Sequence, residues 1–261
     1  MTAAGPTDAY ARRVERVTDP SDPRLAGFDV RRDRALRRTG RFLCEGPLVV
    51  AALLDGPHDV EAVLAAERKA GDFADLDAPT FVAADDVIRR AVGFDFHRGV
   101  IALGRRVPTP LPDDAGGTTL ALDGVEDAEN VGSLLRLAAG FGCRGVLLGP
   151  GTHDPLYRRV VRVSMGHALR LPLQEVDDLA AAVVAFSGRS IAATLAADAV
   201  PLRTLEPNAS TLLVVGSEHR GVSPAVAAVC DVRTTIPMSA GTDSLNVAVA
   251  AGIVLHHLKG L

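Results

Sequence analysis

From residue 118 to the C-terminus, short apolar segments alternate with segments of helical periodicity, and this alternation constrains the fold more than any other feature. The segments of strand character are 118–124, 145–149, 168–176, 190–195, 211–217 and 232–238. The helical segments between and after them are 131–140, 154–166, 177–188, 224–230 and 244–258. Strands that alternate with helices predict an α/β fold with a mostly parallel sheet covered by helices on both faces.

A smaller α/β domain is predicted before this region. Segments 41–46 and 60–65 have strand character, and PLVVAALLDG at 47–56 has the pattern of a helix between them. The stretch VPTPLPDDAGG at 107–117 is rich in turn-forming residues and interrupts the periodic pattern, as inter-domain linkers do. We therefore expect a small domain at 1–106, a linker at 107–117 crossed by few contacts, and a larger domain at 118–261 that folds independently.

Composition places the chain among ordinary globular proteins of the cytoplasm. Apolar residues make up 48% of its 261 residues and charged residues 23%, which suits two packed cores. The first residues contain no apolar stretch of signal-peptide length. The longest apolar run, 245–255, is shorter than the roughly 20 residues that cross a bilayer. The cysteines are odd in number and widely spaced, which argues against disulfides and zinc; they are Cys44, Cys143 and Cys230.

The positive charge is concentrated near the N-terminus. The formal net charge is −4, but residues 12–41 contain ten arginines against five acidic residues. Arginine presents a planar fork of donors to phosphate oxygens, so this segment is a candidate RNA-binding surface. The candidate contacts are Arg31, Arg32, Arg37, Arg38 and Arg41. The alternative interpretation is a solvated helix face with many ion pairs.

Several common chemistries are excluded. GFGCRG at 140–145 matches a dinucleotide-binding string, but a helical segment precedes it and a strand follows, the reverse of what that fingerprint needs. Its glycines are better suited to ending a helix. There is no nucleophile elbow, zinc-protease helix or phosphate-binding P-loop. His256 and His257 are adjacent on a helix and cannot both face one metal, so we expect no metal site.

Polar residues recur where predicted strands end and helices begin. Asn130 stands at the predicted start of the first helix and could cap it. Arg136 is flanked by Leu134, Leu135 and Leu137, so we expect it to be paired or to bind an anionic ligand. Ligands of parallel sheets bind at the carboxyl ends of strands, which makes these positions candidates for one site.

Two later segments supply similar residues. Glu218 follows the strand at 211–217, and Ser244 and Asn246 open the last helix. Thr242 or Ser244 is a plausible N-cap of that helix. The helix itself is apolar nearly all round, so we expect the domain core or a partner subunit to cover it.

The segments 121–142, 212–223 and 236–252, in this order, resemble the three motifs of the SpoU (TrmH-type) RNA ribose methyltransferases. The resemblance implies a catalytic domain with a deep trefoil knot, a homodimer formed through that domain, and methyl transfer from S-adenosylmethionine to a ribose 2′-hydroxyl. It assigns catalysis and RNA positioning to Asn130, Arg136, Glu218, Ser244 and Asn246. It assigns cofactor binding to Thr194, Leu195, Ala196, Gly216, Ile236, Met238 and Leu245.

Residues 1–106 resemble the ribosomal-protein-like RNA-binding domain of many family members, which favours ribosomal RNA over transfer RNA as substrate. The alternatives are a transfer RNA 2′-O-methyltransferase and a catalytically silent RNA-binding or ribosome-assembly factor of the same fold. Two features depart from the family pattern. Asp127-Ala128 replaces the usual Asp-Pro, and His219-Arg220 follow Glu218, where small or varied residues are usual.

Overall fold

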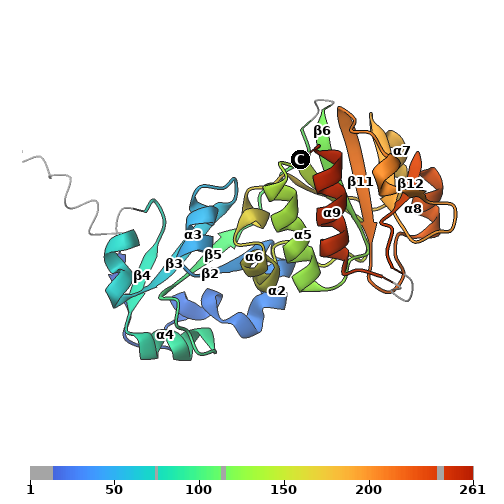
Figure 1. Ribbon diagram of the computed structural model, residues 1–261. Coiled ribbons are helices and arrows are strands. Elements are labelled where there is room, and N and C mark those ends of the chain that lie inside the picture. Colours follow the sequence, from blue (N-terminus) through green and yellow to red (C-terminus); the bar gives the residue numbers. More distant parts are fainter. Residues whose placement is uncertain (1–13, 74–75, 113–115, 240–243, 261) are drawn as a thin grey trace, which may run out of the picture. The chain divides into compact units, whose positions relative to one another are not determined.

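The computed structural model describes residues 14–73, 76–112, 116–239 and 244–260 (Figure 1). The chain divides into two compact units. The first unit comprises the described residues up to Val107 together with Leu156–Arg170, and the second comprises those of Pro108–Pro155 and Leu171–Leu261. Each unit contains its own sheet.

The sheet of the second unit is parallel throughout the described residues, with the order β10-β12-β9-β11-β6-β7-β8. Its strands are β6 (Gly117–Asp123), β7 (Gly145–Leu148), β8 (Leu173–Glu175), β9 (Arg189–Ala193), β10 (Val200–Pro201), β11 (Ser210–Gly216) and β12 (Val232–Thr235). The expected parallel α/β fold is confirmed. The strand predicted at 168–176 is shorter than expected, because a turn of 3-10 helix at His167–Leu169 precedes it, and β10 was not predicted.

Helices cover both faces of this sheet. Side chains alternate along β11, so Leu212 and Val214 share a core with α7 (Leu179–Ala185) and α8 (Pro224–Val229). On the other face, α5 (Ala128–Gly140) and α9 (Val247–Leu258) pack side by side, and α9 contacts β11 (Figure 1). No helix of the described chain is long and apolar enough to cross a membrane.

The sequence offered more than one candidate N-cap for α5 and for α9, the two helices whose first residues lie at the site. Asp127, not Asn130, is the N-cap of α5, and its carboxylate accepts the backbone N–H groups of Glu129 and Asn130. The helix therefore begins earlier than predicted. Asn246 is the N-cap of α9, so Ser244 is not, and Thr242 lies outside the described residues. The end of α5 agrees with prediction, since Gly142 adopts a φ of 62° just beyond it.

The first unit is built on a mixed sheet with the order β1-β4-β3-β5-β2. Its strands are β1 (Val14–Arg16), β2 (Arg41–Glu45), β3 (Asp59–Ala66), β4 (Thr80–Ala83) and β5 (Val100–Arg105), and its N-terminal helices are α2 (Asp33–Arg38), α3 (Pro47–Leu54) and α4 (Asp85–Val92). The two strands and the helix predicted here, at 41–46, 60–65 and 47–56, correspond to β2, β3 and α3.

A segment from the middle of the chain packs with this first unit. Leu156–Arg170 contains α6 (Arg158–Val163), and Val160, Val161 and Leu169 in it are fully buried. Arg158 donates to the Glu45 carboxylate at 2.7 Å. A chain cut before residue 107 would therefore lack the surface that these side chains pack against, which the sequence pattern gave no reason to expect.

The predicted linker is partly bound to the second unit. Thr109 forms an isolated β-bridge with Leu173, and Arg144 donates to the carbonyl oxygens of Pro112 and Gly116. The described part of the segment 107–117 is therefore bound to the second unit and is not a flexible linker.

We expect Glu45→Gln to lower the free energy of unfolding by about 2 kcal/mol, because it removes a buried carboxylate that faces two arginines, and a hydrogen bond to a charged group contributes about 1.5–3 kcal/mol. Glu45 is 6% exposed and faces Arg158 and Arg98. Asp55→Asn is the matched control, since Asp55 is an exposed partner of Arg170 at 2.8 Å and such pairs contribute less than about 1 kcal/mol. Chemical denaturation measures both. Equal effects would show that burial of Glu45 does not govern attachment of the segment.

Candidate functional site

A chain of hydrogen bonds joins the three segments that the sequence singled out. The Asn246 side-chain amide donates to Asn130 Oδ1 at 2.8 Å. The Asn130 amide in turn donates to the Glu218 carboxylate. Asn130 and Asn246 lie in the first turns of α5 and α9, and Glu218 follows β11 directly. The structure thus brings three of the five predicted catalytic residues into direct contact.

The direction of these hydrogen bonds follows from the helix ends. Asn246 Oδ1 accepts the backbone N–H groups of Ala248 and Val249, at 2.9 and 3.3 Å, which leaves its NH₂ group to donate outward. Because Asn130 Oδ1 accepts from Asn246, the Asn130 NH₂ group faces the Glu218 carboxylate. The N-terminal ends of two helices carry partial positive charge, and both lie near this carboxylate. The arrangement holds an anionic group in a defined orientation at an open surface.

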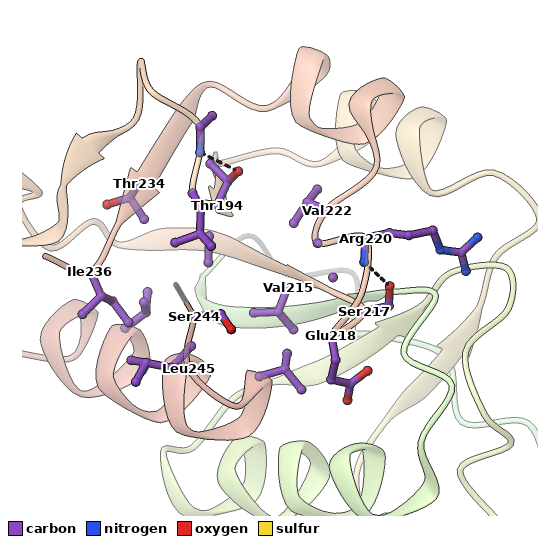
Figure 2. Close-up of a pocket in the computed structure, with 18 of the residues that line it drawn as sticks. Thr194, Val215, Ser217, Glu218, Arg220, Val222, Thr234, Ile236, Ser244 and Leu245 are labelled. Carbon is purple, nitrogen blue, oxygen red and sulfur yellow. Dashed lines mark hydrogen bonds between the residues drawn. The ribbon is translucent and has the colours of Figure 1, made fainter. Parts of the chain in front are cut away.

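Beside Glu218 lies a cavity of about 360 Å³ at the carboxyl ends of β9, β11 and β12 (Figure 2). All seven residues predicted to bind the cofactor line this one cavity: Thr194, Leu195, Ala196, Gly216, Ile236, Met238 and Leu245. Glu218 and Ser244 line it too. Its volume lies within the range of small-molecule sites, which is about 300–1,000 Å³.

The turn after β11 gives the cavity its shape. Ser217 and Gly221 form an isolated β-bridge, and the Gly221 N–H donates to the Ser217 carbonyl at 2.8 Å. A Cβ on Gly216 would lie 2.0 Å from the carbonyl group of Gly221, so only glycine permits the turn to fold back on the strand. Closure of this turn presents Glu218 at its tip.

Arg136 lies on the solvent side of α5, and its predicted binding of an anionic ligand stays a prediction. Its side chain is exposed, and within the described chain it forms no hydrogen bond or ion pair. The helical period turns Leu134 and Leu135 inward and Arg136 outward, so its apolar neighbours do not imply burial. Arg136 lies nearly two turns beyond Asn130 on α5 and does not line this cavity.

The candidate RNA-binding arginines of the first unit are mostly paired. Arg31 donates two hydrogen bonds to Asp29, at 2.8 and 2.9 Å, and these lower the pKa of Asp29. Arg32 lies 3.8 Å from the same carboxylate. Arg41 pairs with Glu61 at 2.7 Å.

The other two candidates differ from each other. Arg37 lies 4.0 Å from Asp33, with its guanidinium 5.0 Å from the Tyr157 ring centroid. Arg38 is exposed and has no such partner in the described chain. The alternative of an ion-paired surface therefore describes much of this cluster. Exposed pairs remain exchangeable, because each is weak.

Sequence reasoning missed part of the cavity wall. Val215, Val222, Thr234, Val247, Ala250 and Val254 also line it. The rule that ligands bind at strand ends would have found Val215 and Thr234, which stand near the carboxyl ends of β11 and β12, the two parallel strands that flank β9. The α9 residues of the cavity wall could not be predicted in this way, because the same apolar helix pattern is expected for residues of the hydrophobic core.

We expect Asn246→Ala to lower the free energy of unfolding by about 1 kcal/mol through loss of the α9 cap. Asn246→Asp should stay within about 0.5 kcal/mol of the wild type, since aspartate caps helices as well as asparagine does, although it cannot donate to Asn130. Denaturant titration distinguishes them. Equal destabilisation by both variants would mean that the bond to Asn130, and not the cap, contributes the stability.

Comparison with known proteins agrees with this geometry. Residues 117–256 match the SpoU rRNA Methylase family. An uncharacterized tRNA/rRNA methyltransferase of Mycobacterium tuberculosis is 41% identical, over 93% of this chain and 91% of its own length. A 23S rRNA (guanosine(2553)-2′-O)-methyltransferase of Bacillus subtilis is 27% identical, over 85% of this chain and 90% of its own.

A solved structure agrees as well. The S-adenosylmethionine-bound rRNA methyltransferase of Sinorhizobium meliloti superposes with a TM-score of 0.83 at 25% identity, covering 95% of this chain and 98% of that one. The family match spans the sheet, the turn after β11 and nearly all of α9. The chain therefore belongs to the SpoU family of RNA methyltransferases.

Proposed function

We propose that the protein transfers the methyl group of S-adenosylmethionine to a ribose 2′-hydroxyl of cytoplasmic RNA, with ribosomal RNA favoured over transfer RNA. The observation that carries the proposal is the hydrogen-bonded chain Asn246–Asn130–Glu218 at the mouth of the cavity. The 2′-O chemistry and the ribosomal substrate of the Bacillus subtilis relative support it.

The cavity suits S-adenosylmethionine, which combines a flat apolar base with polar groups. Leu195, Ile236 and Leu245 give it apolar walls, and Gly216 exposes backbone where a side chain would not fit. When bound, the cofactor supplies an electrophilic sulfonium methyl group. The residues of the chain then have to position the ribose and stabilise the charge that develops on its oxygen.

Glu218 and Arg136 divide that work in our proposal. Glu218 is exposed at the tip of its turn, and Asn130 engages one of its oxygens, so the carboxylate can accept a hydrogen bond from a ribose hydroxyl. Arg136 is an exposed cation on the same helix as Asn130 and would clamp the neighbouring phosphate and stabilise developing alkoxide charge. A guanidinium keeps its proton under ordinary conditions, so we favour this role over that of a base. Ser244 would position the acceptor from the cavity rim.

The first unit would anchor the RNA. Its exposed Arg38 and the exchangeable pairs of Arg31, Arg32 and Arg41 offer donors to phosphate, and Arg37, whose partner Asp33 is buried, would add positive charge. This assignment to 1–106 extends the resemblance to ribosomal-protein-like domains, with the addition that Leu156–Arg170 packs on the same unit.

A homodimer and a trefoil knot complete the proposal. The buried face of α9 packs in the domain core, but Val249 and Ile253 on its opposite face are 52% and 41% exposed. A second copy that covers this face would satisfy the sequence-based expectation for an apolar helix. The knot is supported by the cavity, whose wall combines the turn after β11 with Ile236, Met238, Ser244 and Leu245 from later in the chain.

The direct test incubates the purified protein with tritiated S-adenosylmethionine and unmodified 16S and 23S ribosomal RNA or transfer RNA transcripts. We expect label in ribosomal RNA, recovered after nuclease digestion as a 2′-O-methyl nucleoside. Calorimetry should show saturable binding of S-adenosylmethionine and none of NAD. Label recovered on a base, or label only in transfer RNA, would contradict the proposal as stated.

Arg136→Ala tests the proposed role of Arg136 in the methyl-transfer step. It should lower methyl transfer by roughly 10²-fold, the scale of one catalytic group, and leave S-adenosylmethionine binding unchanged. Its thermal stability should also be unchanged, because the side chain is exposed. Activity within threefold of the wild type would remove Arg136 from the proposed site.

Sedimentation at micromolar concentration should give a dimer, and the double substitution Val249→Glu and Ile253→Glu should give a folded monomer. Charges on a covered apolar face oppose association, whereas exposed positions tolerate them in the monomer. Val184→Glu is the control, because Val184 is 68% exposed on α7. A monomeric wild type, or a double variant that remains dimeric, would place the interface elsewhere or exclude it.

A further inference from the structure

The turn at Ser217–Gly221 separates two cavities. The first is the proposed cofactor cavity. The second, of about 470 Å³, is lined by Glu126, Asp127 and the four residues Ser217, Glu218, His219 and Arg220. Those four residues also line the first cavity. One short turn is therefore the wall common to both.

This turn holds its side chains in fixed directions. The Arg220 N–H donates to Ser217 Oγ at 3.3 Å, in addition to the bond between Gly221 and Ser217. Figure 2 shows Glu218 pointing toward α5, while Arg220 extends away from the first cavity. A group in the second cavity would thus meet Glu218 and Arg220 together, with the donor cavity behind them.

The charges around the second cavity select what can enter it. Three carboxylates line it, and Arg220 is the one permanent cation among its lining residues. The Asp127 carboxylate already accepts two backbone N–H groups, and Glu218 accepts from Asn130. Such a surface attracts hydroxyl donors and repels phosphate, except at Arg220. A nucleotide fits these charges with its sugar inside and a phosphate at Arg220.

Arg220 is available for that contact. Its guanidinium donates to Glu126 at 2.7 Å, but the two side chains are 72% and 67% exposed. An exposed pair of this kind is weak. A phosphate offers the same guanidinium two charged oxygens in the geometry that arginine prefers. Exchange of Glu126 for a phosphate is therefore favourable when RNA is bound.

We propose that the second cavity receives the target ribose and that Arg220 binds the phosphate next to it, displacing Glu126. This inference rests on the proposed RNA 2′-O-methyl transfer and adds a substrate-binding residue to it. Arg220 occupies one of the two positions at which this chain departs from the usual family pattern. Glu126 then acts as a competing anion that occupies Arg220 until RNA arrives.

The test measures methyl transfer to ribosomal RNA transcripts by Arg220→Gln, Glu126→Gln and the control Arg233→Gln. Arg233 forms an exposed pair with Asp198 at the same distance of 2.7 Å and lines neither cavity. Arg220→Gln should raise the KM for RNA by about tenfold, since charge-assisted hydrogen bonds are among the stronger ones. The affinity for S-adenosylmethionine should change much less than the KM for RNA, because the Arg220 side chain extends away from the first cavity. The slope of log affinity against log salt should flatten by roughly 0.7–0.9, as for one lost phosphate contact.

Glu126→Gln distinguishes phosphate binding from a structural ion pair. If the pair only shapes the turn, both substitutions break it and both raise KM. If Glu126 competes with phosphate, its removal lowers KM while Arg220→Gln raises it. Arg220→Lys should retain part of the affinity, because the charge remains.

Failure of this inference is separable from failure of the proposed function. A wild-type protein that methylates no RNA would refute the function itself. An active wild type with Arg220→Gln within twofold of Arg233→Gln, or with Glu126→Gln raising KM as Arg220→Gln does, would refute only the role of Arg220.

Discussion

The site depends on the hydrogen bonds that Asn130 makes in two directions. It accepts from Asn246 and donates to Glu218, and so joins three chain segments that are up to 116 residues apart. Asn246 is fixed by the N–H groups of α9, and Asn130 links it to the Glu218 carboxylate. An asparagine suits this position, since its amide has both a donor and an acceptor. A carboxylate there would repel Glu218.

The parallel sheet explains why these segments meet. β6 and β11 are adjacent parallel strands, paired from Gly117 with Ser210 to Asp123 with Gly216. The segments that follow them, which lead to α5 and to the Glu218 turn, therefore start at the same edge of the sheet. Asp123 reinforces this, because its carboxylate accepts the Ser223 N–H after the turn. Cofactor cavity, catalytic carboxylate and acceptor cavity thus arise from one edge of one sheet in our account.

The sequence predicted most of this architecture because periodicity reports burial. The strands of the second unit other than β10 were predicted from the pattern. The seven proposed cofactor residues came from the resemblance, and all seven line one cavity. The first residue of α5 was harder to predict, because Asp127 and Asn130 are both residue types that favour the N-cap position. The leucines beside Arg136 in the sequence lie on another side of the helix, so they gave no indication that the Arg136 side chain is exposed. The packing of Leu156–Arg170 on the first unit depends on long-range contacts such as Arg158 with Glu45, which no local pattern encodes.

A crystal structure with S-adenosylmethionine bound would test the central claim most directly, namely that the Glu218 turn separates a methyl-donor cavity from an acceptor cavity. We predict that the ligand fills the cavity between Thr194 and Leu245, with its sulfonium methyl directed past Glu218 into the space beside Arg220. The bond between Asn130 and Glu218 should remain intact. A methyl group directed away from that turn, or a ligand bound in the second cavity, would contradict the account.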